Sequence, residues 1–488
     1  MTVLSKMWPI LILLAVVVFV ITRLPKIDVG HDDRFRRRRV WNWLPLGLTY
    51  ALLYMGRYNL TVSKRAFEEM ANADGAALMA NADFGVIFGV GTIVYGLSFL
   101  INGPLTDRFG GRFSILVGAG GALLMNLVMG LASLSLLHQG VGNEFIARNF
   151  VIVFSVLYAA NMYFQSFGAV AIVKVNASWF HVRERGVFGA IFGILISLGI
   201  YFAFDLGGMI LRGMGLAWVF LMPAILLGVF LLIDIGLVRN TPADAGLENF
   251  NTADASSGDD GPRLGAIKVF KMMMRNPVIV TIAIIEFCSG FLRQAIMNWY
   301  GIFAKQTDAI LGLKDSFVNE NWGLLLCCAG ILGGVVAGTI SDHVFQSRRG
   351  PVAAVLYGVM LVGAIVLTFT YDQFFVGWLV VIMSMAVIGV HGMLSGTASM
   401  DFGGSKNVGI AVGIIDGFVY LGTAVMSFTY AFVLPGEQLD AAGKIIGPAT
   451  DPANWRPWPL AMIPMAIIGL ILGLRVWNAK PKGKSAAH

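Results

Sequence analysis

Residues 103–112 read Gly-Pro-Leu-Thr-Asp-Arg-Phe-Gly-Gly-Arg, and this short polar stretch lies between two long apolar runs. A second stretch in the same kind of setting, residues 338–343, reads Gly-Thr-Ile-Ser-Asp-His. The aspartates of the two stretches, Asp107 and Asp342, are 235 residues apart. This spacing indicates an internal duplication, because many membrane proteins consist of two parallel halves related by an axis along the membrane normal.

The composition of the whole chain is that of a protein that crosses a bilayer many times. Of its 488 residues, 57% are hydrophobic and only 13% are charged, whereas a soluble domain carries about 25% charged residues. The 59 glycines suit membrane helices that pack backbone against backbone. The apolar runs last about 20 residues and do not alternate with period two. The sequence therefore predicts an all-α membrane protein and excludes a β-barrel and a soluble enzyme.

Apolar runs of sufficient length predict thirteen membrane spans. The first is an extra N-terminal helix at Trp8–Leu24, which lacks the charge bias and cleavage site of a signal peptide. The other twelve cover residues 43–63, 84–103, 113–137, 145–172, 186–206, 216–237, 277–304, 322–341, 351–371, 374–400, 407–433 and 458–478.

Lys and Arg gather in the loops on the side of the run Arg36–Arg39. The positive-inside rule assigns that side to the cytoplasm. We therefore expect a multi-pass protein of the plasma membrane, the inner membrane of a bacterium, with an external N-terminus and a cytoplasmic C-terminus.

The spans divide the chain into four parts. We expect the extra helix and a basic segment over residues 1–40, six-helix bundles over residues 41–238 and 277–488, and a cytoplasmic linker over residues 239–276. Within the linker, Ile267–Met274 is predicted to be either a short amphipathic helix on the membrane surface or a solvated segment.

Two arginines occupy related positions in the two halves. Arg57 and Arg293 are 236 residues apart, which is nearly the spacing of the aspartates. Each lies about 14 to 16 residues into its span, so both should lie deep in the membrane and face each other across the axis. An arginine near the centre of a membrane helix costs about 2.5–3.5 kcal/mol. A bound anion would offset this cost, because a guanidinium grips phosphate or carboxylate with two hydrogen bonds.

The alternative to an anion clamp is an internal ion pair. Glu286 lies seven residues before Arg293 on the same helix, and Asp416 lies within the eleventh span of the two bundles. Either carboxylate is also a candidate to carry a coupling proton. His391, in an apolar stretch, is expected to be packed and hydrogen-bonded, and the alternative is a coupling role. Asp205, Asp234 and Asp401 fall near span ends, where we expect them to be solvated.

The chain resembles the major facilitator superfamily and, within it, the organophosphate:phosphate antiporter family, from about Trp41 to Asn478. Residues 103–112 are similar to the superfamily element G-x-x-x-D-R-x-G-x-R, and the first and seventh helices of the bundles carry arginines as that family does. The further matching residues are Arg57-Tyr58-Asn59, Phe291-Leu292-Arg293 with Trp299, Thr241-Pro242 with Gly246-Leu247, and Asp342 to Gly350.

The resemblance implies the major facilitator fold, two six-helix bundles related by pseudo-twofold symmetry. It implies exchange of a phosphorylated metabolite for phosphate by alternating access, with phosphate or protons as the coupled species and no cofactor or metal. The residues expected to bind the substrate are Arg57, Arg293, Tyr58, Asn59, Tyr95 and Trp299. The residues expected in the gate loops are Asp107, Arg108, Arg112 and Asp342.

The chain departs from the family in the fifth and second helices. It keeps Arg185 and Gly186, but the polar residues expected at Gly193 and Ile196 are absent, and Phe99 stands where glycerol-phosphate carriers have lysine. We therefore expect a site that favours an anion with an apolar or larger group over glycerol phosphate.

Two further functions remain open on the sequence: a membrane sensor of a phosphorylated metabolite, and a proton-coupled exporter of amphiphilic compounds. No phosphate-binding G-x-x-x-x-G-K-[ST] motif and no catalytic constellation occurs, so neither a primary pump nor an enzyme is expected. Cys288, Cys327 and Cys328 lie in apolar stretches and are expected to be packing residues. The expected partners are a small organic anion and membrane lipid, without nucleic acid, and the chain is expected to be a monomer.

Overall fold

The computed structural model describes residues 30–72, 76–181, 184–252, 265–340, 344–345, 349–394, 399–440 and 445–478. The expected extra helix at Trp8–Leu24 and the gate-loop residue Asp342 lie outside these ranges. Within them, ten helices are long and apolar enough to cross a membrane, and Trp322–Ala337 forms a shorter apolar helix. Helix α2 (Asp33–Glu68) covers the span predicted at residues 43–63. The described part of the chain therefore has the predicted all-helical membrane architecture.

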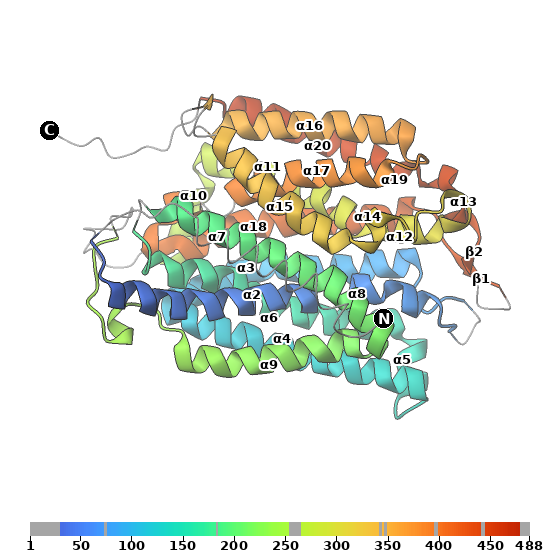
Figure 1. Cartoon of the computed structure of the whole chain (residues 1–488), viewed down its shortest axis with the longest axis horizontal. Coiled ribbons are helices and arrows are strands. Elements are labelled where there is room, and N and C mark those ends of the chain that lie inside the picture. The colour runs from blue at the N-terminus through green and yellow to red at the C-terminus, as the bar shows by residue number, and fades with distance from the viewer. Residues whose placement is uncertain are drawn as a thin grey trace.

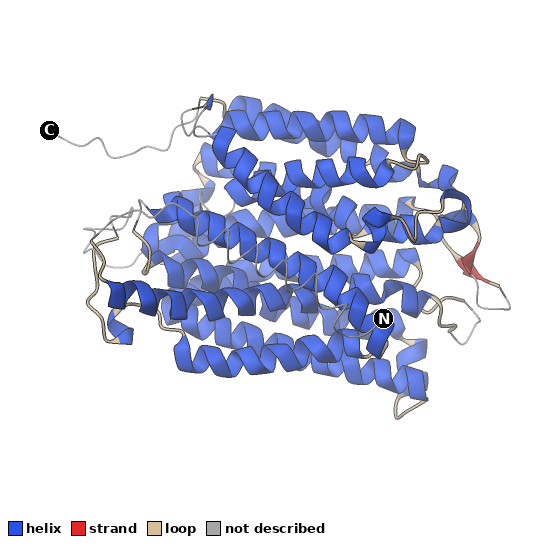
Figure 2. Ribbon diagram, in the orientation of Figure 1, coloured by secondary structure: helices blue, strands red, loops and turns tan. Residues whose placement is uncertain are grey.

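The first half of the molecule is built from helices in the order of the chain (Figures 1 and 2). After α2 come α3 (Asn81–Phe109), α4 (Gly111–His138), α5 (Asn143–Arg148), α6 (Phe150–Ala177), α7 (Arg185–Tyr201), the π-helical turn η2 (Phe202–Leu206), α8 (Gly207–Met214), α9 (Trp218–Leu237) and the 3-10 turn η3 (Ala243–Ala245).

The second half repeats this helical pattern and adds one small hairpin. It follows the linker helix α10 (Ala266–Met274), and its own helices are α11 (Pro277–Met297), α12 (Trp299–Gln306), α13 (Asp308–Leu311), α14 (Phe317–Glu320), α15 (Trp322–Thr339), α16 (Arg349–Thr370), α17 (Val376–His391), α18 (Ser399–Val433), α19 (Pro457–Leu460) and α20 (Met462–Arg475). The strands β1 (Gln438–Leu439) and β2 (Ile445–Ile446) pair antiparallel, and the 3-10 turns η6 (Pro448–Thr450) and η7 (Pro452–Trp455) follow.

The two halves lie side by side, the blue and green helices in one layer of Figure 1 and the yellow to red helices in the other. Helix α3 packs against α18 and helix α7 against α15 where the halves meet. Within the described residues, the span predicted at residues 374–400 corresponds to the candidate membrane span Val376–Leu394, which includes α17. In the linker, the structure has the helix α10, whose Val269 and Met273 are buried against Ile279 and Ile410.

The stretch at residues 103–112 forms the turn from α3 into α4. Gly110 adopts a positive φ of 90°, a conformation that favours glycine. The backbone N–H of Arg112 donates to Oδ1 of Asn240 at 2.8 Å, and its guanidinium donates to the carbonyl of Ile235 at 2.7 Å. Arg108 places its guanidinium 5.2 Å from the ring centre of Phe109. The turn is thus tied to the end of α9 and the loop that follows it.

The end of the molecule that carries Arg36–Arg39, here the basic end, is closed by Asp107. Its carboxylate accepts a hydrogen bond from Lys174 at 2.6 Å. It also accepts from the backbone N–H groups of Gly409 and Ile410 in α18, both at 3.3 Å. A Cβ added at Gly103 would lie 2.6 Å from the carbonyl oxygen of Gly409, so α3 and α18 touch through their backbones here. This contact joins the two halves.

The opposite end is closed by a buried polar cluster. Lys64 donates to Glu437 at 2.5 Å and lies 3.2 Å from Glu68 on its own helix. Gln306 of the second half donates to Glu68 at 2.6 Å and to Asn81 at 3.0 Å. All five side chains are buried. Since this cluster also bridges the halves, the region between the two ends is shut on both sides.

Asp205 makes a second contact at the opposite end, and the expectation that it is solvated was wrong. Its carboxylate accepts from the backbone N–H groups of Gly323 at 2.7 Å and Leu324 at 2.8 Å, at the start of α15. A carboxylate is favourable there because a helix N-terminus carries partial positive charge. Asp205 lies in the π-helical turn η2, and such turns are often found at functional sites.

The expectation for Asp234 was also wrong. Its side chain is buried, and its carboxylate accepts a hydrogen bond from the hydroxyl of Thr49 at 2.7 Å. This bond joins α9 to α2 inside the first half.

Replacing Gly422 by alanine should destabilise the fold. A Cβ added there would lie 1.9 Å from the carbonyl oxygen of Phe287, so α18 would have to move away from α11. We expect a loss of about 1–3 kcal/mol, measured as a lower thermal unfolding midpoint in detergent. The control is Gly358→Ala in α16, where an added Cβ meets no atom within 4 Å. An equal midpoint in both variants would contradict this packing.

Asp205→Asn should open the opposite end. The variant loses the charge of the cap on α15, and a hydrogen bond to a charged group is worth about 1.5–3 kcal/mol, so the open population should rise about tenfold or more. Spin labels at Val141 and Phe374, exposed in loops of the two halves at this end, would report a longer distance in a background with the native cysteines replaced.

The control for this experiment is Asp315→Asn, which neutralises an exposed carboxylate at the same end. An unchanged distance distribution in Asp205→Asn, or the same change in both variants, would show that Asp205 does not hold the halves together.

Candidate functional site

Arg57 lies between the two closed ends, within α2, and its side chain is 1% exposed. Its Nε donates to Oε1 of Gln165 at 3.2 Å, and its Nη2 donates to the hydroxyl of Tyr95 at 2.8 Å. Its Nη1 donates to the hydroxyl of Tyr420, which comes from α18 in the second half. All three nitrogens of this guanidinium therefore have a protein partner.

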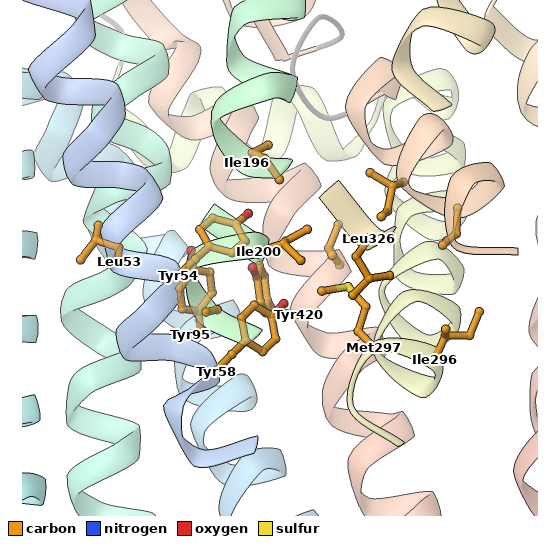
Figure 3. Packing of buried hydrophobic residues seen from close by; sticks show 14 of the residues in the cluster. Leu53, Tyr54, Tyr58, Tyr95, Ile196, Ile200, Ile296, Met297, Leu326 and Tyr420 are labelled. Carbon is orange, nitrogen blue, oxygen red and sulfur yellow. The ribbon is translucent and has the colours of Figure 1, made fainter. Parts of the chain in front are cut away.

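Tyrosine rings surround the same guanidinium. The Cζ of Arg57 lies 4.6 Å from the ring centres of Tyr54 and Tyr95 and 5.4 Å from that of Tyr420. Figure 3 shows these rings converging with that of Tyr58 from different helices. A cation over aromatic faces is stabilised by about 2 kcal/mol or more when water is excluded. The rings therefore help to keep the charge in the interior.

A hydrogen-bonded network of buried amide side chains within the first half orients the group that binds Nε of Arg57. Asn59 donates to Asn126 at 2.5 Å, and Asn126 donates to Asn161 at 3.0 Å. Gln165 donates to the same oxygen of Asn161 at 3.2 Å, which leaves its own oxygen directed at Arg57. The structure thus places Asn59 against α4, three hydrogen bonds away from Gln165, and not beside the guanidinium. This hydrogen-bonded network of amides was not predicted, and its sequence signal is the presence of amide side chains inside apolar spans.

Arg293 is the second arginine, and its environment differs. Its side chain is 3% exposed, and its Nε is buried without a hydrogen-bond partner. Among the described residues, no side chain or backbone group forms a hydrogen bond or an ion pair with it. Its electrostatic neighbours include Tyr58, Tyr420 and Glu286. A buried charge without a partner is costly, so this guanidinium has an unused capacity to bind an anion.

Glu286 bonds to His391 and not to Arg293. Its Oε2 lies 2.8 Å from Nδ1 of His391, and its Oε1 is buried without a partner. The prediction that His391 is packed and hydrogen-bonded is confirmed. Asp416, one turn before Tyr420 on α18, is an electrostatic neighbour of His391 and 8% exposed. The second half therefore holds a carboxylate and imidazole pair close to its arginine.

Residues related by the repeat touch where the halves meet. Gln294 donates to the hydroxyl of Tyr58 at 2.6 Å, and these residues are 236 apart, as Arg57 and Arg293 are. Thr61 donates to Asn298 at 3.1 Å in nearly the same register. The two arginines directly precede the first of these pairs, so they lie on either side of the pseudo-twofold axis.

Apolar groups make up the rest of the surroundings. Ile196 and Ile200 of α7 lie near the tyrosines in Figure 3, as do Met297 and Leu326 of the second half. A Cβ added at Gly193 would meet no atom within 4 Å, so there is open space beside this residue.

Two expected site aromatics lie in different groups. Tyr95 is at the guanidinium, whereas the ring contacts of Trp299 are with Phe84, Tyr430 and Trp455. The structure does not bring Trp299 together with the tyrosines around Arg57.

Comparison with known proteins identifies the family that this chain matches. The profile of the Major Facilitator Superfamily matches residues 46–427. The chain is 24% identical to the glycerol-3-phosphate transporter of Bacillus subtilis, over 94% of this chain and 96% of that protein. It is also 24% identical to the Probable hexose phosphate transport protein of Chlamydia pneumoniae, over 82% of this chain and 84% of that protein. Its identity to the membrane sensor protein UhpC of Escherichia coli is 24%, over 84% and 88% of the two chains.

Solved structures share the fold. A bacterial homologue of the human lysosomal transporter Spinster superposes with a TM-score of 0.60 at 13% identity, covering 90% of this chain and 96% of that one. The nucleoside transporter NupG superposes with a TM-score of 0.59 at 12% identity, covering 90% and 99% of the two chains. The architecture, the repeat-related contacts and the family profile agree, and this chain belongs to the Major Facilitator Superfamily.

Proposed function

We propose that this protein is a secondary transporter that moves an organic phosphate or a related organic anion across the membrane by alternating access. The observation that carries the proposal is Arg293, a buried guanidinium without a hydrogen-bond partner among the described residues. Arg57 lies across the axis from it and contributes the second positive charge. A phosphoryl group bound to both would satisfy Arg293 and offset the cost of burying the two charges.

The class of substrate follows from the relatives and from the side chains of the site. Two relatives are named for the transport of glycerol 3-phosphate and hexose phosphate, which favours a phosphorylated metabolite. The tyrosines around Arg57 and the apolar residues Ile196 and Phe99 offer few hydrogen bonds to sugar hydroxyls. We infer an organic group that is apolar or larger than glycerol. Tyr58 and Tyr95 would contact the substrate, and Trp299 would do so only in another conformation.

Movement of the two halves would give access from each side in turn. The units that move would be residues 41–238 and 277–488, joined by residues 239–276. Release of Asp107 from α18 would open the basic end, with Arg108, Arg112 and Asp342 in the gate loops. Release of Asp205 and of the Lys64 cluster would open the other end.

We further propose that the basic end faces the cytoplasm of a bacterial inner membrane and that the chain acts as a monomer. Counter-transport of phosphate, or of protons through Glu286 or Asp416, would drive the cycle. The hydrogen bond between Glu286 and His391 favours Glu286, because the pair can hold or release a proton in the interior.

A second candidate is a sensor that binds a phosphorylated metabolite and does not transport it. The similarity to the membrane sensor protein UhpC favours this candidate. Translocation separates the two functions: a ligand that binds without counterflow in proteoliposomes would indicate a sensor.

Arg293→Lys and Arg57→Lys should each lower the uptake of phosphate by proteoliposomes about 100-fold or more. A lysine cannot form the two parallel hydrogen bonds that a guanidinium forms with a phosphate. The control is Arg148→Lys, in the short helix α5 remote from the site. All variants must elute as folded protein in gel filtration. Normal uptake by both site variants would remove the arginines from the mechanism.

Glu286→Gln should remove the response of uptake to a pH gradient. The amide can keep a hydrogen bond to His391 but cannot release a proton. The measured quantity is the uptake with an acidic external buffer divided by the uptake without a pH gradient. This ratio should fall to about 1 if the Glu286 carboxylate carries the proton. Asp416→Asn is the comparison. A ratio that changes only in Asp416→Asn would assign the proton to Asp416, and two unchanged ratios would exclude both carboxylates.

A further inference from the structure

One hydrogen bond of Arg57 crosses between the halves of the molecule. Its partners Gln165 and Tyr95 lie on α6 and α3, in the same half as Arg57 itself. Tyr420 lies on α18, in the other half. The bond to Tyr420 therefore forms when the halves close on each other and breaks when they separate at this level.

The backbone around Tyr420 leaves little freedom for its position. Helix α18 lies so close to α11 that a Cβ at Gly422 or Gly290 would come within 1.9 Å of a carbonyl oxygen of the other helix. The ring of Tyr420 lies 4.0 Å from that of Tyr95 and is 5% exposed. The hydroxyl is therefore directed at Arg57 by the packing of the helix that carries it.

This geometry bears on how a carrier closes. A guanidinium that loses water when two bundles come together needs another hydrogen-bond acceptor, because an unsatisfied buried charge is costly. Where only the cargo can supply that acceptor, the bundles close only around cargo, and the carrier exchanges one anion for another. Here Tyr420 supplies the acceptor from the protein itself.

The two arginines would then have different tasks. Arg57 has a full set of protein partners in the closed form, whereas Arg293 has none among the described residues. Arg293 would hold the anion, and an anion oxygen that reaches Arg57 would replace the hydroxyl of Tyr420.

We propose that the hydroxyl of Tyr420 lets the two halves close over Arg57 without an anion bound to it, so that the protein carries out net movement of its cargo as well as exchange. This inference rests on the proposed transport function and concerns the proportion of net movement to exchange. Tyr420 acts as a positioning residue, because its hydroxyl holds Arg57 while the carrier returns across the membrane without cargo.

The test uses the full-length protein in proteoliposomes loaded with radiolabelled inorganic phosphate. Dilution into phosphate-free buffer measures net efflux, and dilution into phosphate buffer measures exchange. In Tyr420→Phe the ratio of net efflux to exchange should fall about tenfold or more relative to the wild type, because only the unloaded closed form loses a charge-assisted hydrogen bond. The ring and its packing are kept.

Tyr158→Phe is the matched control. It removes a buried hydroxyl that donates to the backbone carbonyl of Arg57 at 2.7 Å from α6, within one half, so loaded and unloaded forms lose the same bond and the ratio should stay within about twofold. An unchanged ratio in Tyr420→Phe, or an equal fall in both variants, would overturn the inference. Wild-type protein that exchanges phosphate but shows no net efflux would overturn it too and leave the transport function standing. Absence of phosphate exchange in the wild type would instead contradict the transport function itself.

Discussion

The structure depends on how two guanidinium groups are kept in an apolar interior. Arg57 is satisfied by Gln165, by two tyrosine hydroxyls and by the faces of tyrosine rings. Arg293 lies beyond the axis, buried and without a described partner. Two like charges in a medium of low dielectric constant repel each other and are poorly solvated. An anion relieves both penalties at once, which is why this asymmetric pair, and not either arginine alone, is the centre of the proposed mechanism.

The two arginines lie between two sets of contacts that join the halves, one at each end of the molecule. Asp107 holds α3 to α18 at one end, and at the other end Asp205 caps α15 while Lys64 bridges to Glu437. In both aspartate contacts, a carboxylate of the first half accepts hydrogen bonds from backbone N–H groups of a helix in the second half. These bonds form only when the N–H groups point at the carboxylate oxygens. The cycle of a carrier requires each such contact to form and break in turn. The site lies between them, so the state of the ends controls access to the arginines.

Much of the fold could be predicted from the sequence, and part of the site. Hydropathy predicted the spans, and the spacing of the internal repeat related Arg57 to Arg293. Partners on other helices could not be predicted in this way. Glu286 and Arg293 share a helix face but are about 10 Å apart along the axis, beyond hydrogen-bond reach, and His391 on α17 bonds to Glu286 instead. The roles of Tyr420, Gln165 and Asp205 depend likewise on which helices meet, information that a single sequence does not contain.

The most direct test of the central claim is the thermal stability of purified Arg293→Met with and without inorganic phosphate. If Arg293 is an unpaired charge that waits for an anion, removing it should raise the melting temperature in phosphate-free buffer, since a buried unpaired charge destabilises the fold. Phosphate should then stabilise the wild type but no longer the variant. A variant that melts below the wild type in phosphate-free buffer and is still stabilised by phosphate would contradict the account.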